Sequence, residues 1–121
     1  MDKYNKESFN VGTPSEENIK YAFNKLIYYL EASSVLDDYK SYKNKFDKLL
    51  TEAKKIYSVY DKRKKLSCIE DKKLQSIKFD LIDLADETRL MKSYYAEWSL
   101  QWIEAIISLR ISEKKAEVNN G

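Results

Sequence analysis

The sequence predicts an all-α protein, and three features of its 121 residues support this prediction. Turn formers are scarce, with 2 Gly and 1 Pro, so the residues that β-hairpins require are nearly absent. Charged residues make up 35% of the chain. Apolar residues recur at three- and four-residue spacing, as they do on one face of a helix. We therefore expect an elongated antiparallel helical hairpin or a three-helix bundle with a long C-terminal helix.

The first expected helix covers residues 13–32. Thr13, Pro14 and Glu16 place a capping hydroxyl, a proline and a carboxylate in the order typical of a helix start. An apolar stripe follows and ends before two serines; it comprises Ile19, Phe23, Leu26, Ile27 and Leu30. Residues 1–12, which precede this start, are expected to form a flexible arm.

The second expected helix covers residues 35–62. Ser34 and Asp37 have the spacing of a helix cap. Seven residues then form a stripe at alternating three- and four-residue spacing: Tyr39, Tyr42, Phe46, Leu49, Ala53, Ile56 and Tyr60. A polar turn between Lys62 and Ser67 is expected to follow.

The third expected helix covers residues 67–116. Ser67 and Glu70 repeat the capping spacing, and no Gly or Pro occurs from there to Gly121. At about 1.5 Å per residue such a helix is roughly 70 Å long, whereas a compact chain of this size has a radius of gyration of about 14 Å. We therefore predict one helical domain over residues 13–117, with residues 118–121 as a tail and an overhang beyond residue 96.

The predicted overhang is apolar around most of its circumference, and a helix of this kind requires burial on several sides. We therefore expect a homo-oligomer. Its interface would comprise Trp98, Trp102, Ile103, Ile106, Ile107 and Leu109. The alternative is a monomeric three-helix bundle with a kinked third helix.

The composition argues against most enzyme classes. The chain has no His and 1 Cys, which excludes a disulfide framework, a zinc finger, iron–sulfur ligation and a cysteine–histidine nucleophile. We predict no enzymatic activity, no catalytic residue, no cofactor and no metal, and we interpret Cys68 as a structural thiol.

One acidic row is the strongest alternative to this metal-free interpretation. Asp80, Asp83, Asp86 and Glu87 have a spacing with which all-α nucleotide pyrophosphatases hold magnesium. Such sites need a second acidic pair on a facing helix, where this chain offers only Asp47 and Glu52. The sequence therefore favours a solvated face.

Positive charge is concentrated in the middle of the chain. The net charge of the whole chain is +2, whereas residues 34–73 carry twelve Lys or Arg and seven Asp or Glu. An antiparallel hairpin would gather many of these cations at one end, where they would contact phosphates, and Tyr57 would stack on a base. This predicted basic tip comprises Lys54, Lys55, Lys62, Arg63, Lys64, Lys65, Lys72 and Lys73. The alternative is that these lysines only solvate the helix ends.

Two segments resemble a known family. Residues 54–63 are rich in lysine and tyrosine, and residues 102–110 form an aromatic-to-aliphatic run that ends in Arg110. Over residues 35–111 this layout resembles the UvsY-type recombination mediators of tailed phages and similar small helical phage proteins. The resemblance implies a ring-forming protein that binds single-stranded DNA and helps a recombinase displace single-strand binding protein. It also implies that the lysines around 54–65 contact the DNA.

We therefore predict a phage or mobile-element accessory protein that binds single-stranded DNA in recombination or replication. One alternative is an inhibitor or adaptor, such as an anti-host or anti-CRISPR factor, that docks through Tyr21, Tyr28, Tyr29 and Tyr39. Another is a small helical subunit of a CRISPR complex. The polar first twelve residues and the lack of a long apolar run predict a cytoplasmic protein with no membrane partner, in the host cytoplasm if phage-encoded.

Overall fold

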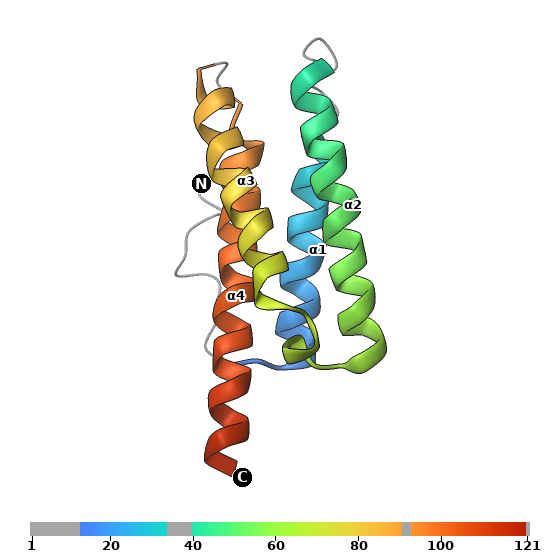
Figure 1. Ribbon diagram of the computed structural model, residues 1–121, viewed down its shortest axis with the longest axis vertical. Helices are drawn as coiled ribbons and strands as arrows, with labels where there is room; N and C mark the ends of the chain where they lie inside the picture. The colour runs from blue at the N-terminus through green and yellow to red at the C-terminus, as the bar shows by residue number, and fades with distance from the viewer. Residues whose placement is uncertain (1–12, 34–39, 91–92, 121) are drawn as a thin grey trace.

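The computed structural model describes residues 13–33, 40–90 and 93–120, which form an antiparallel bundle of α-helices (Figure 1). The elements are α1 (Glu16–Ala32), α2 (Lys40–Arg63), the 3₁₀ helix η3 (Leu66–Cys68), α3 (Asp71–Arg89) and α4 (Tyr95–Asn120). The predicted all-α class is confirmed. The expected hairpin or three-helix arrangement is wrong, because the described residues contain four α-helices.

Helix α1 begins at Glu16, two residues after Pro14, the proline of the predicted helix start. The Ser15 hydroxyl accepts a hydrogen bond from the backbone N–H of Asn18 at 3.1 Å, so Ser15 and not Thr13 caps the helix. Thr13 contributes its carbonyl oxygen, which accepts from the Asn18 side chain at 3.0 Å. The end of α1 at Ala32 agrees with the prediction.

Helix α2 ends close to its predicted end. It closes at Arg63, and Lys64 follows with a left-handed φ of 59°. The Lys64 N–H donates to the Tyr60 carbonyl at 2.6 Å, which completes the last turn. The predicted polar turn is therefore confirmed, whereas the predicted cap at Ser34 lies outside the described residues.

The predicted start of the third helix, at Ser67, is wrong. Residues 66–68 form η3, and α3 begins only at Asp71. Glu70 is the N-cap residue of α3 but makes no side-chain capping hydrogen bond. The capping spacing of Ser67 and Glu70 therefore does not mark a helix start here.

The predicted single helix over 67–116 is also wrong, because the chain reverses direction between α3 and α4. The Ser93 N–H donates to the Thr88 carbonyl at 3.2 Å, and the Arg89 guanidinium donates to the Glu97 carboxylate at 3.0 Å across the reversal. Helix α4 then continues to Asn120, into the predicted tail.

Burial of α4 gives the physical reason for the reversal. Helix α4 packs against both α1 and α3, and α1 also packs against α2, whereas the contact between α2 and α3 is smaller than these three. Ile103, Ile106 and Leu109 are fully buried in this arrangement. A straight helix would leave these side chains in water, at a cost of about 25 cal/mol for each Å² of apolar surface.

The predicted oligomer interface is consequently inside the chain. Trp102 is also buried, and Trp98 and Ile107 are partly buried against the same core. The apolar surface that motivated a homo-oligomer is thus covered by the chain's own helices, although the last turns of α4 project beyond the bundle (Figure 1), so oligomer formation stays a prediction without that interface. None of the described helices has the length and apolar character needed to cross a bilayer.

The fold predicts a strong effect of a single α4 side chain. Ile106→Ala should lower the free energy of unfolding by about 2–5 kcal/mol, because it leaves a cavity in the core of one chain. Leu90→Ala is the control, since Leu90 is 89% exposed and its loss should change stability by less than about 0.5 kcal/mol. Urea denaturation measures both values, and a stability of Ile106→Ala equal to that of Leu90→Ala would contradict the four-helix packing.

Candidate nucleic-acid interface

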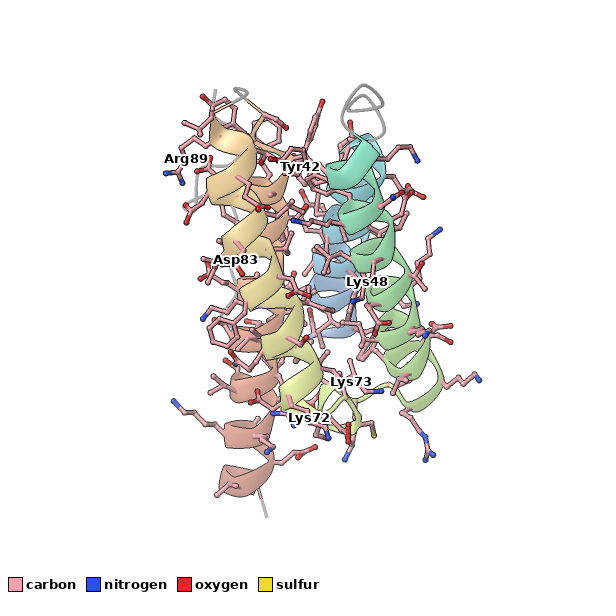
Figure 2. All side chains as sticks on the ribbon, turned by 45° about the horizontal axis from the view of Figure 1, so that its top comes forward. Tyr42, Lys48, Lys72, Lys73, Asp83 and Arg89 are labelled. Carbon is pink, nitrogen blue, oxygen red and sulfur yellow. The ribbon has the colours of Figure 1, made fainter. Side chains whose placement is uncertain are left out.

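The structure gathers part of the predicted basic tip at one end of the bundle. Lys62 and Arg63 end α2, Lys64 and Lys65 follow in the turn to α3, and Lys72 and Lys73 lie on the first turn of α3 beside it (Figure 2). The first turn of α1 and the last turns of α4 reach the same end (Figure 1). The tip is thus built from all four helices and not from a two-helix hairpin.

Carboxylates of α1, α2 and α4 form ion pairs with two of the tip cations, Lys64 and Lys65. Lys64 Nζ lies 3.1 Å from Glu16 of α1 and 3.1 Å from Asp61, and Lys65 Nζ lies 3.1 Å from Glu117 of α4. Hydrogen bonds to Asp61 and Glu16 raise the pKa of Lys64, and the hydrogen bond to Glu117 raises the pKa of Lys65. These two ammonium groups therefore already have anionic partners.

Three predicted contact residues lie on α2 at a distance from the tip, one to three turns before its C-terminal end. Lys54 pairs with Glu31 of α1 at 3.7 Å. Lys55 is exposed and lies 3.6 Å from Glu52 on its own helix. Tyr57 stacks on Phe23, with ring centroids 4.9 Å apart and an interplanar angle of 16°. One face of the Tyr57 ring is therefore covered by the core, which leaves it poorly placed to stack on a base.

A row of lysines along α2 joins two predicted contact residues, Lys55 and Lys62, to Lys48, which the sequence prediction did not include. Lys48, Lys55 and Lys62 recur every seven residues and are all exposed, with the exposed Thr51 and Ser58 between them. Seven residues advance a helix by about 10.5 Å with little rotation, so the three side chains form a row about 21 Å long. Figure 2 shows Lys48 on α2. The seven-residue spacing of these lysines is a signal in the sequence that predicts such a row.

The bundle concentrates its positive charge on α2. This helix holds eight Lys or Arg and three Asp or Glu, a net charge of +5. By the same count α1, α3 and α4 each carry a net charge of −1. The positive face of the molecule is therefore one helix, and it extends beyond the predicted tip.

Two α4 side chains hold the α2–α3 turn in place. The Glu113 carboxylate accepts hydrogen bonds from the backbone N–H groups of Leu66 and Ser67, both at 2.9 Å. One turn earlier on α4, Arg110 Nε donates to the Ile69 carbonyl at 3.1 Å. We call Glu113 and Arg110 the turn clamp. Arg110, the residue that ends the aromatic-to-aliphatic run of the sequence, thus has a specific packing role.

The acidic row lies opposite lysines and not opposite a second carboxylate set. Asp80, Asp83, Asp86 and Glu87 line a groove of about 540 Å³ between α2 and α3, together with Lys45 and Lys48. Lys45 Nζ lies 3.2 Å from Glu87 across the groove. Within the described residues no group of three or more Asp, Glu, Cys or His side chains is placed to hold a metal ion. Cys68, interpreted as structural, is exposed on η3.

Comparison with protein-family models, curated proteins and solved structures gives no match for this chain. The resemblance to UvsY-type mediators accordingly stays an expectation from the residues alone.

The turn clamp yields a stability prediction. Glu113→Ala removes two charge-assisted hydrogen bonds from half-buried N–H groups and should lower the free energy of unfolding by about 1–3 kcal/mol. Glu117→Ala, one turn later on the same helix, loses only an exposed ion pair with Lys65 and should be indistinguishable from wild type. Thermal and urea denaturation test this, and equal stabilities of the two variants would show that the clamp contributes nothing.

Proposed function

We propose that this protein is a non-enzymatic accessory protein that binds single-stranded nucleic acid along α2. The observation that carries the proposal is the charge distribution, because α2 holds a net charge of +5 in a chain whose total is +2. Neutralisation of phosphates by lysines is the main source of sequence-independent affinity for nucleic acids.

The shape of the lysine row favours a single strand. Lys48, Lys55 and Lys62 lie about 10.5 Å apart on one straight helix. A flexible strand can bring a phosphate to each ammonium in turn, whereas the phosphates of a rigid duplex curve away from a straight, convex helix. The row therefore fits a strand that runs parallel to the α2 axis.

The tip extends this row. Lys62 and Arg63 make no ion pair within the described part of the chain, and Lys72 and Lys73 are exposed beside them. A strand following α2 towards its C-terminal end would reach these four cations next. The role in recombination or replication, with a recombinase as partner, rests on the resemblance to the phage mediators.

The proposal predicts a steep salt dependence of binding. For single strands the slope of log K against log salt is about −0.7 per phosphate contacted, so three lysines give a slope near −2. Charge reversal of the row (Lys48→Glu, Lys55→Glu and Lys62→Glu) should reduce binding of a fluorescent dT oligonucleotide by at least tenfold and flatten the slope. Fluorescence anisotropy at several salt concentrations measures both quantities.

The matched control reverses three lysines on other helices: Lys78→Glu, Lys114→Glu and Lys115→Glu. It changes the net charge by the same amount but leaves α2 intact. Equal losses in the two triple variants would mean that total charge and not the α2 row determines binding. Tighter binding of a duplex than of the single strand would overturn the proposed preference.

The tip cations should contribute unequally, because two of them already have carboxylate partners. The double variant Lys62→Gln and Arg63→Gln is expected to weaken oligonucleotide binding more than the adjacent Lys64→Gln and Lys65→Gln, although both remove two positive charges. Anisotropy titrations at one low salt concentration compare them. A larger loss from the second pair would show that the ion pairs to Glu16, Asp61 and Glu117 open when the strand binds.

A further inference from the structure

A second surface, on α1 and the start of α4, is lined by aromatic rings. We call it the aromatic face and define it by Tyr21, Lys25, Tyr28, Tyr94 and Trp98. Tyr21, Tyr28 and Tyr94 are 48%, 59% and 40% exposed, and Trp98 is partly buried. Of the four tyrosines expected to dock a partner, Tyr21 and Tyr28 are thus on this surface, whereas Tyr29 is buried and Tyr39 lies outside the described residues.

The exposed rings rest on buried ones. Tyr29 lies between Tyr28 and Trp98, with ring centroids 5.1 Å and 5.5 Å away. Tyr21 meets Trp102 edge-to-face at 5.5 Å, and Tyr94 lies 6.3 Å from Trp98. These contacts hold the rings in defined positions. Binding at this surface therefore loses little side-chain entropy, which favours affinity.

Lys25 is the one formal charge in the defined set. Its Nζ lies 5.6 Å from the centroid of the Tyr21 ring and 5.8 Å from that of Tyr28. The described residues provide no carboxylate within ion-pair distance of it, in contrast to Lys20 one turn earlier, which pairs with Glu16 at 3.1 Å. The surface thus combines aromatic rings with a cation whose anionic partner is missing.

We propose that the aromatic face binds an apolar segment of a partner protein that carries an Asp or Glu, with this carboxylate paired to Lys25. Tyr and Trp are enriched at protein interfaces, where an apolar body and a polar group act together. A carboxylate that reaches Lys25 between two tyrosine rings is partly shielded from water, which strengthens the ion pair. This surface is separate from the α2 lysine row, so the inference does not depend on the proposed nucleic-acid binding.

Charge argues against the two other occupants. A nucleic acid needs several cations along its backbone, and this surface has one. A second copy of the chain would bring another Lys25 to the contact, and the five defining residues include no carboxylate to receive it. An acidic, apolar segment is the occupant that complements both the rings and the charge.

The test uses a display library of helical peptides with apolar residues at positions i, i+3, i+4 and i+7 and all other positions randomised. Selection on the wild-type protein should enrich Asp or Glu at one position beside the apolar stripe. The best peptide is then synthesised and titrated by fluorescence anisotropy. Failure to enrich any peptide, or enrichment without an acidic residue, would overturn the proposal.

Variants then locate the binding surface. Tyr28→Ala and Lys25→Glu should each weaken the peptide roughly tenfold or more, as for central interface residues. Phe79→Ala is the matched control, because Phe79 is also 59% exposed but lies on α3, and it should leave binding unchanged. A peptide with Lys in place of its acidic residue should recover affinity for Lys25→Glu.

Three results would contradict the inference. The first is equal peptide binding by Tyr28→Ala and Phe79→Ala, with circular dichroism confirming that both are folded. The second is loss of dT oligonucleotide binding in Tyr28→Ala, which would identify the surface as a base-stacking site. The third is a wild-type dimer, by light scattering, that Tyr28→Ala converts to a monomer, which would identify a second copy as the occupant.

Discussion

Burial of α4 on more than one side is the constraint on which the rest of this structure depends. Its central residues, Ile103, Ile106 and Leu109, are fully buried because α1 covers one side of the helix and α3 another. Satisfying this requirement reverses the chain after Arg89, although no glycine or proline marks the place. The reversal in turn makes α1 and α4 neighbours, and it places the last turns of α4 against the α2–α3 turn. The positions of the aromatic face and of the turn clamp both follow from this packing of α4.

The packing also explains where the positive charge remains available. Helix α2 packs mainly against α1 and makes a smaller contact with α3, so more of its circumference faces water than that of α4. Near the tip, acidic residues of α1 and α4 approach the lysines of the α2–α3 turn and pair with Lys64 and Lys65. Along the middle of α2, Lys48 borders the groove that holds the acidic row of α3, and Lys54 pairs with Glu31 of α1. The lysines at positions 48, 55 and 62 are nevertheless exposed, as a phosphate contact requires.

Local signals in the sequence predicted local structure, and long-range contacts decided the rest. Thr13, Pro14 and Glu16 predicted the start of α1 to within a few residues, and the polar run after Tyr60 predicted the end of α2, because capping and turn chemistry act over short distances along the chain. The reversal between α3 and α4 has no such signal, since it is stabilised by burial of α4 against α1. The ion pair of Lys64 with Glu16 and the hydrogen bonds of Glu113 to the turn join residues more than 40 positions apart. A basic run in the sequence thus overestimates the charge available at the tip, whereas the heptad spacing of the α2 lysines is a local signal that predicts their common row.

The two proposed surfaces differ in physical character, which has a consequence for how they act together. Affinity along α2 comes from phosphate neutralisation and falls steeply as salt rises. Affinity at the aromatic face comes mainly from apolar burial, which salt screening changes little, with one shielded ion pair at Lys25. Because the surfaces lie on different helices, occupancy of one does not cover the other. Under the two proposals, the bundle would keep a protein partner attached while it releases and rebinds a nucleic acid strand, because rising ionic strength would weaken the α2 contact more than the aromatic one.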